Sequence, residues 1–196
     1  MQVKEKCSVL YLIGRQMFRI LFGLFYRWHI EGVENIPQSG GAIIAPNHIS
    51  FFDPPLTGSA MKRPLYFMAK KELFNIPVFG WMIKQTNAFP VKRGTQDMVA
   101  MRQAFSLLKN GHLLLIFPEG TRSKDAKIGK ARTGAGMMAC NAQVPLIPVK
   151  IEHTNTMIKF KQIRIKYGKP IYPLKEFKKS DYINLSQKAL DAIAKM

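Results

Sequence analysis

Residues 42–53 of the chain read AIIAPNHISFFD. The beginning of this stretch is apolar and follows two glycines, which predicts a short buried strand over Ala42–Pro46. A histidine and an aspartate, His48 and Asp53, come soon after this strand. Because open α/β sheets place their sites at the carboxyl ends of strands, the stretch predicts both a buried strand and a functional site.

Further short apolar runs alternate with segments of helical periodicity along the chain. Strands are expected over Pro64–Ala69, Ala88–Val91, Leu113–Phe117, Leu146–Glu152 and Ile163–Tyr167. Helices are expected over Pro54–Met61, Thr95–Asn110, Gly134–Asn141 and Asp181–Lys195. This alternation predicts an α/β fold with a largely parallel sheet flanked by helices.

The helix expected at Thr95–Asn110 has the clearest pattern in the chain. Thr95 can cap its N-terminus and Gly111 stops it. Its apolar stripe is formed by Met98, Met101, Phe105 and Leu108.

Composition narrows the class of protein. The chain has 196 residues, of which 47% are hydrophobic, so one domain with a sizeable core is expected. Thirty Lys and Arg against 12 Asp and Glu give a net charge of +18. That charge predicts an anionic partner, which can be nucleic acid, a membrane surface or a phosphorylated ligand. Two cysteines, Cys7 and Cys140, are too few for a disulfide scaffold, and neither has the neighbours of a metal site.

The N-terminal residues 9–28 read VLYLIGRQMFRILFGLFYRW. Arg15, Gln16 and Arg19 interrupt the apolar run, whereas a spanning helix needs roughly 20 mostly apolar residues. We therefore expect residues 1–30 to form an amphipathic helix that lies in a membrane interface. The alternative is a helix that packs its apolar stripe on the domain formed by the rest of the chain.

The pair His48 and Asp53 is the first candidate for chemistry. On an ideal helix a spacing of five separates two residues by about 140°, but a loop that leads into a helix can bring them together. Asp53 precedes Pro54, which suits an N-cap followed by proline. In that geometry the carboxylate accepts the imidazole N–H, and the other ring nitrogen can serve as a general base. The alternative is that Asp53 only caps the helix and His48 is an ordinary loop histidine.

Residues that can bind an anionic substrate follow the other predicted strands at the same sheet edge. They are Lys70, Lys92, Arg93, Glu119, Gly120, Thr121 and Arg122. Gly120 permits close backbone approach to a ligand, and backbone N–H groups with the Arg122 fork suit a phosphate. Glu119 can orient Arg122 or hold the loop. Cations beside a helix N-terminus are unfavourable unless an anion lies between them, which favours a binding role for Lys92 and Arg93 over a solvated basic loop.

Four motifs resemble those of the glycerolipid acyltransferases, in that family's order. Asn47-His48-x4-Asp53 resembles the H-x4-D motif, and residues 89–94 (FPVKRG) are similar to the second motif. Residues 117–123 (FPEGTRS) resemble the phosphate-binding motif, and residues 144–149 (VPLIPV) resemble V-P-x-x-P-V. The chain is thereby identified as similar to the bacterial 1-acyl-glycerol-3-phosphate acyltransferases, with residues 31–196 as the acyltransferase domain.

The resemblance implies transfer of an acyl group from acyl-CoA or acyl carrier protein to lysophosphatidic acid, which yields phosphatidic acid. His48, oriented by Asp53, would deprotonate the acceptor hydroxyl, and Lys70, Arg93 and Arg122 would hold the phosphate. This chemistry requires no metal or other cofactor. The expected location is peripheral, at the cytoplasmic face of the cell membrane, with an anionic membrane surface rather than nucleic acid as partner.

Three alternatives remain open at this point. An acyltransferase of the same family can use another acceptor, such as glycerol 3-phosphate or another lysolipid. A thioester hydrolase would use water as the acceptor. A non-enzymatic basic protein would bind nucleic acid or membrane through its charge, but the chain has no helix-turn-helix, zinc-finger or RNA-binding signature.

Overall fold

The computed structural model describes residues 8–92, 97–123 and 125–196. Within these residues, seven strands form one sheet: β1 (His29–Glu31), β2 (Ala42–Pro46), β3 (Leu65–Lys70), β4 (Ala88–Val91), β5 (Leu113–Leu115), β6 (Leu146–Glu152) and β7 (Arg164–Tyr167). The α-helices are α1 (Val9–Tyr26), α2 (Asp53–Ala60), α3 (Phe79–Lys84), α4 (Met98–Lys109), α5 (Thr133–Ala142) and α6 (Lys179–Ala194). Short 3-10 helices are η1 (Val33–Asn35), η2 (Lys71–Asn75) and η3 (Thr154–Lys159).

The strand order is β1-β7-β6-β2-β5-β3-β4. β2 runs parallel to both of its neighbours, β5 and β6, and β3 runs parallel to β5 and β4. β7 is antiparallel to β6, and β1 is parallel to β7. The expectation of a largely parallel α/β sheet is confirmed, and the carboxyl ends of β2 to β6 all meet at one edge.

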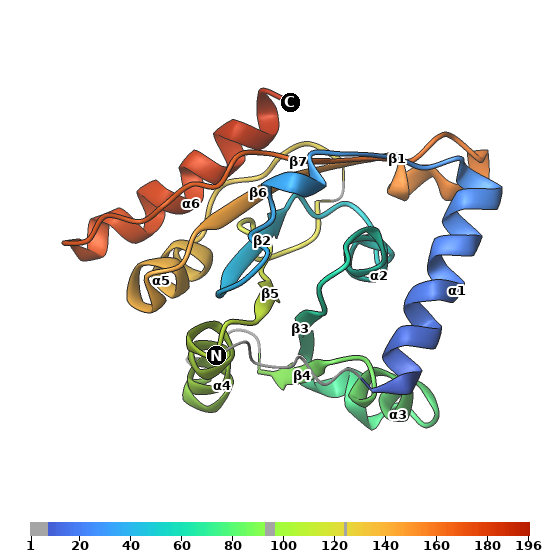
Figure 1. The fold of residues 1–196 in the computed structure, drawn as a ribbon, viewed down its shortest axis with the longest axis horizontal. Coiled ribbons are helices and arrows are strands. Elements are labelled where there is room, and N and C mark those ends of the chain that lie inside the picture. The colour runs from blue at the N-terminus through green and yellow to red at the C-terminus, as the bar shows by residue number, and fades with distance from the viewer. Residues whose placement is uncertain (1–7, 93–96, 124) are drawn as a thin grey trace.

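Helices cover both faces of the sheet, as Figure 1 shows. Side chains of β2 alternate between two cores, since successive residues of a strand point to opposite faces. Ile44 packs with Phe22 of α1 and Leu56 of α2, whereas Ile43 packs with Leu108 of α4 and Met138 of α5. Burial on both faces explains why β2 reads as an unbroken apolar run.

The helix expected at Thr95–Asn110 forms with two corrections. It begins at Met98 and its N-cap is Asp97, whose carboxylate accepts the N–H of Ala100 at 3.1 Å; Thr95 lies outside the described residues. Its fully buried stripe consists of Ala100, Ala104 and Leu108, with Met101 and Phe105 packed beside it. Met98 is exposed, because the small alanines rather than the methionine lie on the sheet.

Two strands differ from expectation. The strand expected at Leu113–Phe117 ends at Leu115, because the chain leaves the sheet to form the loop of residues 117–123. β1 was not expected; it has three residues, and it forms by pairing with β7. A strand that short at a sheet edge leaves no periodic signal in the sequence.

The N-terminal helix α1 is attached to the domain along one stripe. The Tyr11 hydroxyl accepts the N–H of Leu65 at 3.0 Å, and Phe22 is fully buried. Gln16 and Arg19 are exposed on the helix. Its other exposed side chains are mostly large and apolar: Val9, Leu10, Leu12, Ile13, Met17, Ile20, Leu24 and Phe25. The helix has a mean hydropathy of 1.3 and 11% of its residues buried, so by length and composition it could also cross a membrane. A single such helix near an N-terminus is weak support for a span, since a signal sequence passes the same measures.

Candidate active site

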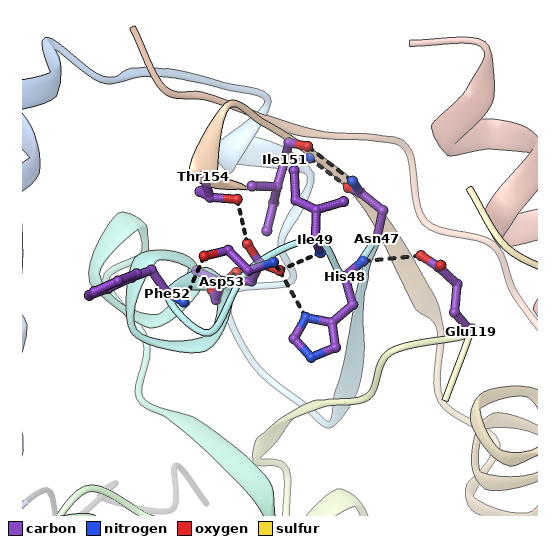
Figure 2. Close-up of polar contacts among 10 residues, drawn as sticks. Asn47, His48, Ile49, Phe52, Asp53, Glu119, Ile151 and Thr154 are labelled. Atoms are coloured by element: carbon purple, nitrogen blue, oxygen red, sulfur yellow. Dashed lines mark hydrogen bonds and ion pairs between the residues drawn. The ribbon is translucent and has the colours of Figure 1, made fainter. Parts of the chain in front are cut away.

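His48 and Asp53 are in direct contact at the carboxyl end of β2. Nδ1 of His48 lies 2.8 Å from Oδ2 of Asp53, and Nε2 points away from the carboxylate (Figure 2). Because the carboxylate accepts a proton from Nδ1, the neutral ring carries its lone pair on Nε2. The pairing expected from the sequence therefore forms, with one ring nitrogen left for a substrate.

The Asp53 carboxylate is buried completely and accepts four hydrogen bonds. Besides His48, Oδ2 accepts the backbone N–H groups of Ile49 and Ser50, each at 2.7 Å. Oδ1 accepts the Thr154 hydroxyl at 2.7 Å. A buried carboxylate is unfavourable unless it is paired in this way, and four donors hold it in one orientation.

The expected N-cap role of Asp53 is wrong. Asp53 is the first residue of α2, and its carboxylate turns back to the loop that precedes the helix rather than to the helix N–H groups. The loop brings the N–H groups of Ile49 and Ser50 to one point, so it competes successfully for the carboxylate. Asp53 therefore stabilises the loop between His48 and α2 instead of capping the helix.

The main chain of His48 is held on both sides by the loop of residues 117–123. Its N–H donates to Oε1 of Glu119 at 3.0 Å, and its carbonyl accepts the N–H of Ser123 at 2.8 Å. The imidazole stacks on Phe117, with ring centroids 3.8 Å apart and planes 14° apart. The side chain of His48 retains 10% exposure. The ring is thus fixed in position but still open to a substrate.

Glu119 holds the loop, one of the two uses expected for it. Its second oxygen, Oε2, accepts the N–H of Gly129 at 3.1 Å, and the side chain is buried. Both oxygens are therefore engaged by main-chain N–H groups. Glu119 therefore fixes the main chain of His48 relative to the segment around Gly129.

Two residues that support the site were missed from the sequence. Asn47 continues β2 by bonding both main-chain groups of Ile151, with Oδ1 accepting at 2.7 Å and Nδ2 donating at 3.0 Å. Thr154, which bonds Asp53, lies 101 positions further along the chain. No local sequence pattern predicts either contact. The contact of Asn47 depends on the position of β6 and that of Thr154 on the position of η3, and the sheet sets both positions.

Gly120 and Arg122 lie where a ligand can reach them. Gly120 has a φ of +69°, and a Cβ there would lie 2.6 Å from Cδ of Arg132, so only glycine fits this turn. Arg122 and its neighbour Thr121 are exposed, and the Arg122 guanidinium lies 3.7 Å from the ring centroid of Phe51. Phe51 belongs to the loop between His48 and Asp53. The cation is thereby placed beside the loop that joins His48 to Asp53.

The remaining cations lie at the same edge, farther along the sheet. Lys70 ends β3, opposite Val91 of β4, and its ammonium lies 3.7 Å from Glu72. Lys92 follows β4, and its N–H donates to Asp97 at 2.9 Å. β5 separates β3 from β2, so neither lysine belongs to the His48–Asp53 network. Arg93 lies outside the described residues.

A cavity of about 670 Å³ lies beside the loop of residues 117–123. The cations that line it are Lys127, Lys130 and Arg132. Its other polar walls include Thr121 and Ser123. Two carboxylates, Glu119 and Asp125, also line the cavity, which is therefore bordered by three cations and two acidic groups. Among the residues that the structure describes, no group of three or more His, Cys, Asp or Glu could hold a metal ion.

The model of the acyltransferase family matches residues 27–152. This match spans His48 and Asp53, all the strands whose carboxyl ends meet at their edge of the sheet, and the loop of residues 117–123. The chain belongs to the acyltransferase family. This family assignment agrees with the resemblance drawn from the four motifs.

Individual acyltransferases are similar to the chain over most of its length. The chloroplastic 1-acyl-sn-glycerol-3-phosphate acyltransferase of Arabidopsis thaliana is 34% identical over 137 residues, which is 68% of this chain and 38% of that protein. The proteins with the same activity name from Streptococcus pneumoniae and Bacillus subtilis are 33% and 31% identical, over 73% and 71% of this chain and 55% and 71% of their own lengths. The chain therefore spans less than two thirds of several of these relatives.

The acyltransferase fold also agrees with a solved structure. The 1-acyl-sn-glycerophosphate acyltransferase PlsC from Thermotoga maritima superposes with a TM-score of 0.78 at 28% identity. The superposition covers 94% of this chain and 77% of that one. The mostly parallel sheet with flanking helices is therefore the fold of a known acyltransferase.

Proposed function

We propose that this acyltransferase moves a fatty acyl group from a thioester to the free hydroxyl of 1-acyl-glycerol-3-phosphate. The observation that carries the proposal is the contact of 2.8 Å between His48 Nδ1 and the buried Asp53, which leaves Nε2 open as a base. The activity for which the similar proteins are named supports the acceptor. The reaction product is phosphatidic acid, and the donor is acyl-CoA or acyl carrier protein.

The chemistry needs only one group that takes up and returns a proton. Nε2 of His48 removes the proton of the acceptor hydroxyl as its oxygen attacks the thioester carbonyl carbon. Asp53 stabilises the imidazolium that forms. When the tetrahedral intermediate collapses, the carbon–sulfur bond breaks and the imidazolium returns its proton to the thiolate. An ester and a free thiol leave, and His48 is neutral again.

Electrostatics select an acceptor that carries a phosphate. Arg122 is exposed beside the loop that joins His48 to Asp53, and Lys70 and Lys92 lie at the same sheet edge. An arginine fork binds phosphate oxygens in pairs, which fixes the distance between the phosphate and the reacting hydroxyl. In this proposal Arg93 adds a further cation. The reaction takes place at the cytoplasmic face of the membrane, where both amphiphilic substrates are concentrated.

The test is acyl transfer in mixed micelles that contain lysophosphatidic acid, with acyl-CoA and acyl carrier protein tried separately. We expect phosphatidic acid from the wild type and a loss of about 10²–10⁴-fold in His48→Ala, the range for a positioned base. His29→Ala is the matched control, because His29 also bonds a carboxylate, Glu31 at 3.0 Å, but is exposed on β1. Equal activity of wild type and His48→Ala would contradict the mechanism. If product forms only with glycerol 3-phosphate or another lysolipid, that compound is the acceptor instead of lysophosphatidic acid.

A further inference from the structure

A second apolar surface lies on the segment that connects β3 to β4. It is formed by Ile76, Val78, Phe79, Trp81 and Met82, all of which are exposed. Val78 is 74% exposed and Trp81 57%. Large apolar side chains gathered on one short segment are unusual for a surface that faces only water.

The fold itself turns these side chains outward. Gly80 is buried, and a Cβ at that position would collide with the carbonyl of Phe74, so α3 packs on η2 through its glycine. Val78 precedes α3 with a φ of 62°, a conformation rare for a β-branched residue. The small face of α3 therefore points inward, and the side chains of Val78, Trp81 and Met82 are left outside.

This surface lies beside the N-terminal end of α1. The Ser8 hydroxyl, which caps α1, donates to the carbonyl of Gln85 directly after α3 at 2.6 Å. Figure 1 shows α3 beside the N-terminal end of α1. The first turns of α1 expose Val9, Leu10, Leu12 and Ile13. The two elements thus lie beside each other, and each presents exposed apolar side chains.

Cations flank the segment at both ends. Lys71 and Lys84 are exposed on either side of Ile76–Met82, and Arg19 is exposed on α1. The acidic neighbour, Glu72, is ion-paired with Lys70. An apolar centre with tryptophan and phenylalanine, bordered by cations, has the chemistry of a surface that meets anionic lipid headgroups.

We propose that residues 76–84 form a second membrane contact, which inserts Val78, Phe79 and Trp81 into the interface of an anionic bilayer beside α1. This inference rests on the proposed function, since its substrates are lipids. The segment follows the carboxyl end of β3 through η2, and that edge is the one at which β2 presents His48. Two contacts, one on α1 and one on α3, restrict how the protein can tilt on the bilayer. The active-site edge is thereby kept at the surface from which the acceptor comes.

The first test is co-sedimentation of the full chain with vesicles of phosphatidylcholine and phosphatidylglycerol in equal parts. We expect Val78→Glu to weaken binding about tenfold, because a charged side chain replaces an apolar one in the interface. Val99→Glu is the matched control: Val99 is 75% exposed on α4, at the opposite face of the sheet. Equal vesicle binding by the two variants, at unchanged melting temperature, would overturn the proposal.

Trp81 supplies an independent reporter of insertion. In a Trp28→Phe variant, Trp81 is the remaining tryptophan, since the chain has two. We expect lipids brominated in their acyl chains to quench its fluorescence when the protein is bound to vesicles. Bound protein without quenching would show that the segment stays in water and would refute the insertion.

Two further measurements separate this inference from its alternatives. In detergent micelles Val78→Glu should keep the acyl-transfer rate of the wild type, whereas on vesicles the rate should fall with binding. If no combination of thioester donor and lysolipid gives product, the proposed function is wrong. Quenching of Trp81 would still show that the segment inserts into the bilayer. If Val78→Glu converts a lipid-free dimer to a monomer in analytical ultracentrifugation, the surface binds a second copy of the chain and the proposal is wrong.

Discussion

The backbone N–H of His48 donates to Oε1 of Glu119, a residue 71 positions further along the chain. The same carboxylate accepts the N–H of Gly129. One buried side chain therefore ties the loop that joins His48 to Asp53 to the loop of residues 117–123 and to the segment that follows it. This arrangement explains why an acidic residue occurs in a region that otherwise attracts anions.

Glu119→Gln should lower kcat more than it raises KM for the lysolipid. The amide keeps one acceptor but cannot accept from both N–H groups, so one buried donor loses its partner, at a cost of about 1–3 kcal/mol in stability. Steady-state kinetics and thermal melting measure the two effects. Glu119→Asp, which keeps the charge, should recover part of kcat; a rise confined to KM would instead indicate direct contact with the substrate.

Asp53→Asn should reduce kcat by about 10³–10⁴-fold, because an amide that donates toward Nδ1 selects the wrong imidazole tautomer. The folded state should also lose stability, since an amide cannot accept from all four donors that surround the carboxylate. Thr154→Val removes only the hydrogen bond to Oδ1 of Asp53, so it should lower kcat and stability less than Asp53→Asn does. Activity of Asp53→Asn close to that of the wild type would refute the pair.

Phe51→Ala should raise KM for a phosphate-bearing acceptor while kcat stays unchanged. The ring lies under the Arg122 guanidinium at 3.7 Å, and an exposed cation–π contact of about 0.5–1 kcal/mol corresponds to about a two- to fivefold change. Phe51→Tyr retains the aromatic face and should restore KM. A loss of kcat that tyrosine fails to restore would mean that Phe51 acts on the loop and not on the arginine.

The stability of the protein should decrease as the pH rises above 9.0, the ordinary pKa of a cysteine thiol. Burial raises the pKa of the Cys140 thiol, and Asp181 adds to the shift. Burial likewise raises the pKa of the Tyr167 hydroxyl above its ordinary 10.0. A group whose pKa is raised on folding stabilises the protein fully below its unfolded pKa, and that contribution is lost as the pH rises through the folded value.

Urea unfolding of wild type and Cys140→Ala, below and above pH 9.0, measures the part that belongs to the thiol. The variant should show a smaller decline in unfolding free energy over this pH range. The comparison concerns the slope against pH, because the alanine itself leaves a small cavity. Identical slopes would mean that the thiol does not contribute.

The bounds of three strands were predictable from the sequence, including those of the partly exposed edge strand β4. The bounds of β2, β4 and β6 agree with the expected ranges, because apolar runs flanked by glycine, proline and polar residues leave little choice of where a strand begins and ends. The contact between His48 and Asp53 was equally predictable, since both residues lie in one short motif. Thr154 was not, because its contact with Asp53 depends on the position of η3 relative to the sheet. Met98, expected on the apolar stripe of α4, is exposed, because hydrophobicity alone does not reveal which residues are small enough to let a helix approach the sheet.

Helix α1 has a consequence for how the chain is made. The residues that α1 packs against are synthesised after it. The Tyr11 hydroxyl, for example, bonds the N–H of Leu65, which lies 54 positions further along the chain. Until those residues are made, the apolar side chains on both faces of the helix are unburied, and a bilayer is one apolar environment that would bury them. A nascent chain that settles on the membrane at this stage would fold the sheet onto an inserted helix. Arrival at the lipid surface and completion of the core would then be one event in biosynthesis rather than two.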